Sequence, residues 1–235
     1  MIGPLTSIDL FANQERRVLE IMKIAALSLR SENELPFHED ALNRLLYRHV
    51  IRATRQVQRM DSYLDWPCIY EANNQPDASD FQRTKRESKR PDFQWGIYDH
   101  TEPEIDRSQK FYTAECKRLG SPAPGSAWVF NENYVCNGMF RFIDPTYGYA
   151  KSARSGLMIG YLQSMKEDDV LSEINAHAET LSVERIKLDL AGWRVGDVTR
   201  LRSLLSRPQV LPTPFNLHHL WVDLRNPPTD PEPEQ

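Results

Sequence analysis

Two stretches of the sequence decide the fold: RPDF at residues 90–93 and FYTAECKRL at residues 111–119. An acidic residue opens the first apolar segment, and a Glu-x-Lys motif lies inside the second. Because alternate side chains of a strand point to the same face, Glu115 and Lys117 project together, while Cys116 turns toward the core. The second stretch therefore places a carboxylate and an ammonium group side by side.

Asp92 joins this pair if the segment after it forms a strand next to residues 110–117. Its carboxylate then lies beside that of Glu115, and two carboxylates supply oxygen ligands for a hard cation such as Mg²⁺. The backbone carbonyl of Cys116 is a further candidate ligand, whereas the thiol points away. Lys117 is placed to orient an attacking water or to help deprotonate it.

Pro91-Asp92 followed by Glu115-x-Lys117 resembles the signature of the PD-(D/E)xK nuclease superfamily. Uncharacterised bacterial members resemble the chain over about residues 88–165, notably in YVCNGMFRF at 134–142 and MIGY at 158–161. The resemblance implies an α/β fold, in which a restriction-endonuclease-like mixed central β-sheet is flanked by helices. It also implies Mg²⁺-dependent phosphodiester hydrolysis, for which Mn²⁺ can substitute, with Asp92 and Glu115 holding the metal and Lys117 positioning the water.

Members of this superfamily often add a carboxylate from a helix that precedes the strands. Glu39 is the first candidate because it opens an amphipathic segment, and Glu34 and Glu71 are open alternatives. A carboxylate in the first helical turn also complements the helix dipole, so Glu39 has a structural explanation as well. By the same resemblance Arg141 and Tyr161 support the site or contact phosphate, although each could instead border the core.

The resemblance also implies partners. The substrate is expected to be nucleic acid, with DNA favoured and RNA as the alternative, and the setting bacterial anti-phage defence or restriction. Small nucleases of this type commonly act as homodimers or beside a sensor protein. The alternative function is a catalytically silent member of the fold that acts as a binding or assembly subunit.

Composition restricts the classes of protein that the chain can belong to. With 235 residues and a net charge of −4, one domain over residues 1–226 is expected, without the general basic character of a nucleic-acid packaging protein. Three cysteines without C-x-x-C spacing indicate a reducing compartment and no zinc cage. No signal peptide or membrane-spanning run is evident, so we expect a cytoplasmic protein without membrane contact.

Periodic apolar residues predict amphipathic helices over about residues 13–29 and 39–60. The second helix also carries arginines within a narrow sector opposite its apolar face. This arginine stripe consists of Arg44, Arg48, Arg52, Arg55 and Arg59. It is explained either as a solvated face or as a surface that contacts phosphates, with Arg48, Arg52 and Arg55 as the contacting residues.

Residues 71–89 are polar, lack periodicity and contain Pro76, which predicts a mobile loop that becomes ordered on nucleic acid. The loop ends in basic residues next to the proposed metal carboxylate. Lys89 and Arg90 are therefore candidates for backbone contacts, with simple solvation as the equal alternative.

The remaining elements follow from local signals. Asn131 or Asn133 is expected to cap a helix that runs to about residue 142. Residues 93–98 and 155–162 read as strands, the latter buried on both faces. Ser164 and Glu167 have capping-box spacing before another helix. Residues 215–224 read as a last strand, and the Pro-rich tail at 227–235 is expected to be disordered.

The histidines His177, His218 and His219, with Asp223, offer a second possible metal site. On a strand His219 and Asp223 share a face and His218 points away, so the two adjacent histidines do not chelate together. A histidine at the edge of the core with satisfied hydrogen bonds is the favoured explanation.

Overall fold

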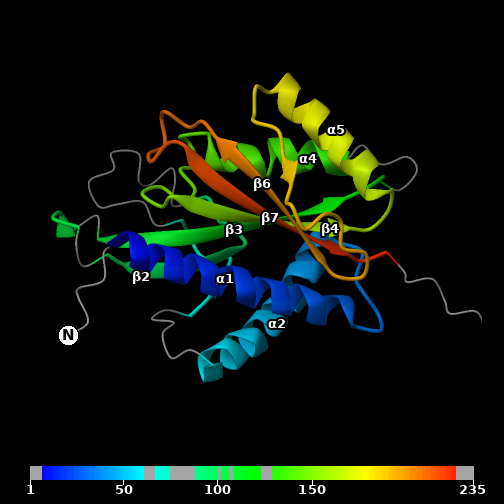
Figure 1. The fold of residues 1–235 in the computed structure, drawn as a ribbon, viewed down its shortest axis with the longest axis horizontal. Coiled ribbons are helices and arrows are strands. Elements are labelled where there is room, and N and C mark those ends of the chain that lie inside the picture. Colours follow the sequence, from blue (N-terminus) through cyan, green and yellow to red (C-terminus); the bar gives the residue numbers. More distant parts are fainter. Residues whose placement is uncertain are drawn as a thin grey trace, which may run out of the picture.

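The computed structural model describes residues 7–60, 67–74, 88–99, 102–105, 108–122 and 129–225. Within these residues seven strands form one mixed sheet in the order β1-β2-β3-β4-β7-β6-β5 (Figure 1). Its strands are β1 (Ile69–Tyr70), β2 (Phe93–Tyr98), β3 (Gln109–Leu119), β4 (Ser155–Leu162), β5 (Lys187–Leu188), β6 (Val198–Leu205) and β7 (Phe215–Asp223). The central strands β3, β4 and β7 are parallel, and the flanking pairs are antiparallel.

Helices cover both faces of the sheet (Figure 1). On one face lie α1 (Ser7–Arg30) and α2 (Glu39–Met60), and on the other lie α4 (Phe130–Cys136) and α5 (Glu167–Thr180). A 3₁₀ turn, η2 (Met139–Phe142), follows α4. The expected α/β class, with a mixed central sheet between helices, is confirmed.

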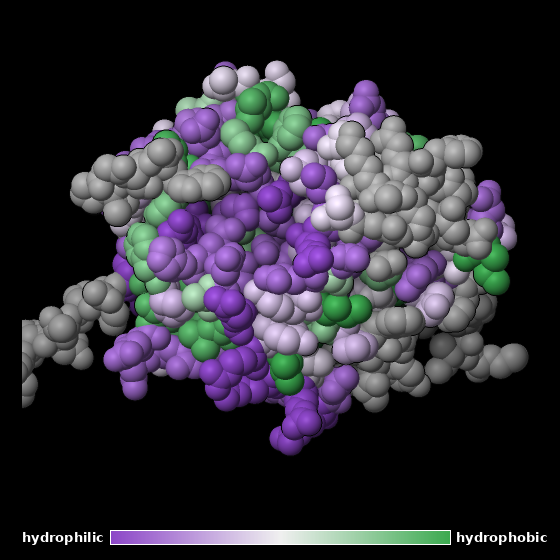
Figure 2. Space-filling model, turned by 180° about the vertical axis from the view of Figure 1, so that it is seen from behind, coloured by the Kyte–Doolittle hydropathy of each residue, from purple (hydrophilic) through white to green (hydrophobic). Residues whose placement is uncertain are grey.

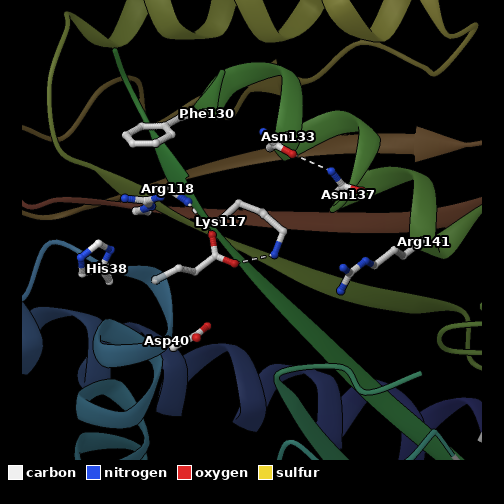
Figure 3. Close-up of a pocket in the computed structure, with 9 residues that line it drawn as sticks. His38, Asp40, Lys117, Arg118, Phe130, Asn133, Asn137 and Arg141 are labelled. Carbon is white, nitrogen blue, oxygen red and sulfur yellow. Dashed lines mark hydrogen bonds and ion pairs between the residues drawn. The ribbon is translucent and has the colours of Figure 1, made fainter. Parts of the chain in front are cut away.

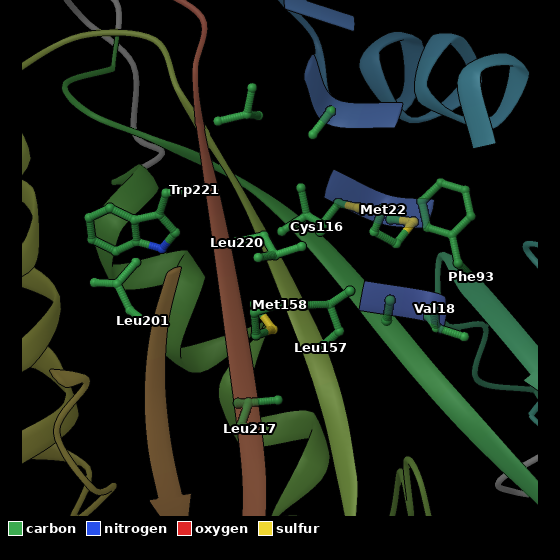
Figure 4. Close-up of a cluster of buried hydrophobic side chains, with 14 of the residues drawn as sticks. Val18, Met22, Phe93, Cys116, Leu157, Met158, Leu201, Leu217, Leu220 and Trp221 are labelled. Atoms are coloured by element: carbon green, nitrogen blue, oxygen red, sulfur yellow. The ribbon is translucent and has the colours of Figure 1, made fainter. Parts of the chain in front are cut away.

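The core lies between the sheet and these two helical layers. All eight residues of β4 are buried, as its continuous apolar run predicts. Cys116 and Leu157 face Val18 and Met22 of α1, whereas Trp221 and Leu201 lie on the opposite face of the sheet (Figure 4). The side of the molecule opposite to the view of Figure 1 is hydrophilic across its centre, with smaller apolar areas around it (Figure 2).

Two capping expectations are wrong. The N-cap position of α4 is Val129, and Asn131 lies inside the helix, where its side chain accepts from the N–H of Gly120 (3.0 Å) and donates to Glu173 (2.7 Å). Ser164 likewise accepts from the N–H of Ser121 (2.8 Å), and the N-cap position of α5 is Lys166. In both cases a tertiary partner uses the side chain that local spacing assigned to a cap.

The other expected elements agree with the structure apart from their ends. The first helix begins earlier than expected, and the helix expected to reach residue 142 is divided into α4 and η2. The expected tail at 227–235 and residues 75–87 of the expected loop lie outside the described residues. No helix in the described parts of the chain combines the length and apolar composition needed to cross a membrane.

Candidate active site

The register between β2 and β3 brings Asp92 to the Glu-x-Lys motif. Phe93 pairs with Ala114, so that the preceding Asp92 lies opposite Glu115. Its Oδ2 accepts a hydrogen bond from the N–H of Cys116 (2.6 Å), which ties the carboxylate to the middle of the motif. The expected meeting of the two stretches therefore occurs.

Lys117 is the centre of the cluster. Its ammonium donates to Glu39 Oε1 (2.7 Å), to Glu115 Oε1 (2.9 Å) and to the carbonyl oxygen of Cys116 (2.7 Å). The side chains of Lys117 and Glu115 are only 8% and 1% exposed, against 27% for Glu39. Solvent therefore reaches the cluster past Glu39 and past Arg141, whose side chain is 24% exposed.

Glu39 is the one of the three carboxylate candidates that meets the motif with its side chain. As the first residue of α2 it directs Oε1 to Lys117, and Oε2 accepts from the N–H of Arg118 (3.3 Å). Glu71 approaches Asp92 through its backbone N–H, which donates to the Asp92 carbonyl oxygen (3.0 Å). Glu34 is exposed between α1 and α2.

The surroundings of the cluster shift the pKa values of Asp92 and Lys117. Burial raises the pKa of Asp92 well above its usual range, and the neighbouring Glu115 carboxylate raises it further. Burial alone would lower the pKa of Lys117, but the surrounding carboxylates, first Glu115 and then Glu39, outweigh it and raise the pKa. Lys117 is therefore charged at neutral pH and suits an electrostatic role better than that of a base.

Arg141 reaches the same cluster from the η2 turn. Its guanidinium donates to Glu115 Oε1 (2.5 Å) and lies over the ring of Tyr147, 5.4 Å from the centroid. Lys89 lies over the same ring, at 4.8 Å. Arg90 donates instead to Asn73 (3.2 Å). The structure thus brings Arg141 to the carboxylates and Lys89 to its neighbour Tyr147, while Arg90 is held by the Asn73 side chain.

Asn43 is a site residue that the sequence analysis missed. Its Nδ2 donates to Asp92 Oδ1 (3.0 Å), and its Oδ1 accepts from the hydroxyl of Tyr161 (2.8 Å). Tyr161 thus supports Asp92 through Asn43. The available signal was a polar residue inside the apolar stripe of the helix at 39–60, beside Leu42 and Leu46.

The arginine stripe lies on the other side of α2 from the site. All of its residues are exposed. At about 100° per residue, Glu39 falls on the same side of the helix as buried Leu42 and Leu46. Arg48, Arg52 and Arg55 therefore do not face the cluster.

An open cleft of about 440 Å³ lies beside the cluster. Figure 3 shows Phe130 and Arg118 at one end, Arg141 at the other and Lys117 between them. The residues that line the cleft are His38, Glu39, Asp40, Lys117, Arg118, Phe130, Asn133, Asn137 and Arg141.

The donor set suits a hard divalent cation. Glu115 Oε2 is buried and has no hydrogen-bond partner among the described residues, which leaves a carboxylate oxygen free for a ligand. Asp92 and the Cys116 carbonyl add the oxygen donors that Mg²⁺ prefers. In the described part of the chain, no three His, Cys, Asp or Glu side chains form a metal-binding group, so the fit rests on two carboxylates and a carbonyl.

The histidines are explained without a metal. His219 is fully buried, its Nδ1 is bonded to the Tyr134 hydroxyl (2.8 Å) and its Nε2 to the Ser203 hydroxyl (3.0 Å). Burial lowers the pKa of His219 to about 3, so the ring is neutral. His218 turns to the other face and contacts Glu15 (2.9 Å). The expectation that the hydrogen bonds of the histidine are satisfied is confirmed, but His219 lies inside the core and not at its edge.

Family models, curated proteins and solved structures were compared with the chain, and none matches significantly. The function is therefore inferred from the site itself.

Proposed function

We propose that the protein is a metal-dependent nuclease of the PD-(D/E)xK type that hydrolyses phosphodiester bonds of nucleic acid, DNA in preference to RNA. One observation carries the proposal. Glu39 and Glu115 bond the buried ammonium of Lys117, and the Asp92 carboxylate lies near enough to raise its pKa, although the three carboxylates come from separate parts of the chain. An isolated surface ion pair would not require this burial, which has a large desolvation cost.

Asp92, Glu115 and the Cys116 carbonyl are the residues that would hold Mg²⁺ or Mn²⁺. When bound, the cation would polarise a phosphoryl oxygen and lower the pKa of water. The buried free oxygen of Glu115 and the repulsion between the two carboxylates support this assignment, because a divalent cation would satisfy the first and relieve the second.

In the proposed hydrolysis a water oxygen attacks phosphorus, one P–O ester bond breaks, and a proton from the water ends on the leaving alkoxide. Lys117 positions the water and stabilises the negative charge that develops on the phosphoryl oxygens. Glu39, the most exposed of the carboxylates bonded to Lys117, is placed to accept the proton first. Arg141 is placed to contact the scissile phosphate or the phosphate next to it in the strand.

The proposed contacts beyond the reacting phosphate are with Lys89 and Arg90 near the site, and with Arg48, Arg52 and Arg55 on the outer side of α2. We also propose a cytoplasmic location, in which Cys68, Cys116 and Cys136 stay reduced, as their unpaired state favours.

The test compares cleavage of plasmid, single-stranded DNA and RNA in Mg²⁺, Mn²⁺ or chelator. Wild type should cleave at least one of them in either metal and none in chelator. Lys117→Ala should lower the rate at least about a hundredfold, as the loss of one electrostatic stabiliser typically does. Lys110→Ala is the matched control, since Lys110 lies on the same strand and pairs with Asp99 (2.6 Å). Its rate should stay near that of wild type.

Two results would contradict the proposal: no metal-dependent cleavage of any substrate, or more than about a tenth of wild-type activity in Lys117→Ala. Calorimetric titration with Ca²⁺ distinguishes the nuclease from the alternative function, a binding subunit without catalytic activity. A catalytically silent binding subunit would bind nucleic acid without cleaving it, and its weak binding of divalent cations would be the same in wild type and Glu115→Ala.

A further inference from the structure

We propose that the cleft beside Lys117 binds one unpaired nucleotide of a nucleic-acid strand, with its base on Phe37 and Arg118 beside the cleft and its phosphate between Lys117 and Arg141. We call Phe37 and Arg118 the stacking platform. The inference rests on the proposed function for the choice of nucleic acid over other phosphorylated ligands. It goes further by assigning a base-binding surface and a preference for single strands.

The platform is a preformed aromatic and cationic surface. The Arg118 guanidinium lies over the Phe130 ring at 4.2 Å from the centroid and over the Phe37 ring at 5.1 Å. The two rings are themselves 6.2 Å apart. Phe130 is only 5% exposed and holds Arg118 from the protein side, whereas Phe37 is 49% exposed and leaves part of its ring open to a ligand. Bases stack on exposed aromatic and guanidinium planes regardless of sequence.

The backbone around Phe37 is held independently of its ring. The Phe37 carbonyl accepts from Gln163 Nε2 (3.1 Å) and from Arg118 (3.4 Å). The ring can therefore be removed without releasing the segment, which makes Phe37 a suitable position for a test.

The opposite end of the cleft suits a phosphate. Lys117 and Arg141 both line this end of the cleft with a cationic side chain. Along the wall between the two ends, Asn137 donates to Asn133 (2.5 Å), which donates in turn to the Val129 carbonyl (2.9 Å). This chain of hydrogen bonds fixes two amides where the edge of a base would lie.

The size of the cleft suits a single nucleotide. A cleft of about 440 Å³ is of the size that takes one small ligand. In an intact duplex each base is stacked and paired, so it could enter only after it had been flipped out, at an energetic cost. A single strand enters without that cost.

The experiment measures binding in chelator by fluorescence anisotropy, so that it does not depend on cleavage. The probes are a short labelled single strand, a blunt hairpin of the same sequence, an abasic strand of equal length and free deoxyadenosine monophosphate as competitor. The variants are Phe37→Ala and Arg118→Met. Arg194→Gln is the control, because Arg194 is an exposed arginine outside the cleft. Circular dichroism checks that each variant is folded.

Wild type should bind the single strand at least about tenfold more tightly than the hairpin, and the free nucleotide far more weakly than the strand. Phe37→Ala should weaken single-strand binding by about 5- to 150-fold, the equivalent of 1–3 kcal/mol for one stacked base. Arg118→Met should weaken it in the same direction. Phe37→Ala should have no effect on the abasic strand, and Arg194→Gln none on any probe.

Equal affinity for strand and hairpin, no effect of Phe37→Ala, or equally tight binding of the free nucleotide would each overturn the inference. Wild-type cleavage in Mg²⁺ together with any of these results would overturn the inference alone. Platform-dependent strand binding without cleavage would support it and count only against nuclease activity.

Discussion

Asp92 carries an energetic cost because burial and the Glu115 carboxylate disfavour its charged form. Its pKa is raised in the folded state relative to about 3.9 in the unfolded chain, so the folded protein binds more protons between these two values. Stability therefore falls as pH rises through that interval. We predict that Asp92→Asn is more stable than wild type near neutral pH, with an advantage that shrinks toward about pH 4. Urea unfolding at a series of pH values measures this.

The hydrogen bonds of the site can accommodate the amide at position 92. Asn43 can turn its side chain to accept from the new amide and donate to the Tyr161 hydroxyl, which reverses the present direction of both bonds. Asp99→Asn is the control, since Asp99 is buried but paired with Lys110 and should lose stability. An Asp92→Asn protein less stable than wild type at neutral pH would show that the charge of Asp92 is favourable in the fold.

Arg207 is a fully buried arginine that joins two loops. Its guanidinium lies 3.5 Å from the centroid of the Phe215 ring and donates to five main-chain carbonyls. These carbonyls belong to Pro212, Phe142, Tyr149, Ala150 and Ala153. We predict that Arg207→Met lowers the free energy of unfolding by about 2–4 kcal/mol, because several buried carbonyls lose their donors. Exposed Arg202, changed to Met, should cost less than about 0.5 kcal/mol in the same urea assay.

At the scale of elements, the arginine stripe of α2 faces away from the cluster around Lys117. A nucleic acid can contact it only if the chain is long enough to pass from the site around the helix. We predict that replacing Arg48, Arg52 and Arg55 with Gln leaves the affinity for a short strand unchanged. For a long substrate it should make the dependence of log affinity on log salt shallower by about 0.7–0.9 per lost contact.

The matched control for this variant changes three exposed arginines away from the stripe to Gln: Arg185, Arg194 and Arg202. It removes the same charge and should preserve the slope. If the salt dependence of binding to a long substrate is unchanged in the stripe variant, these arginines are only solvated and do not contact phosphates.

The elements that could be predicted are those whose burial alone creates a periodic pattern. The helix at 39–60 and the strand at 155–162 have the expected bounds, and strand alternation correctly paired Glu115 with Lys117. β6 was missed although VTRLRSLL alternates between buried and exposed residues. The roles of Asn43 and Asn131 could not be read locally, because the partners of both side chains lie far away in the sequence.

At the scale of the whole molecule, the cleft lies at the change from antiparallel to parallel pairing. β3 is antiparallel to β2 and parallel to β4. Glu115 and Lys117 of the proposed site lie in the carboxyl-terminal half of β3, and Arg118 and Phe130 continue the cleft beyond them. Ligands of α/β sheets commonly bind outside the carboxyl ends of strands, where loops and helices diverge. This topology places the cluster around Lys117 and the Arg118 side chain of the proposed stacking platform along one cleft.

A metal in this position would join elements that are distant in sequence, because Asp92 precedes β2, Glu115 lies in β3, and Glu39 of α2 contacts their common lysine. Binding to the folded state alone raises its stability, by about 2.7 kcal/mol at a hundred times the dissociation constant. For a chain of this size that corresponds to an increase in Tm of about 5–10 °C.

We predict such an increase for wild type in Mg²⁺ relative to NaCl of equal ionic strength, measured by calorimetry. Glu115→Gln should lose it, and Glu102→Gln, which changes a carboxylate near Lys110, should keep it. An equal increase in Glu115→Gln, or none in wild type, would remove the metal from this cluster and leave Lys117 and Arg141 as its permanent counter-ions.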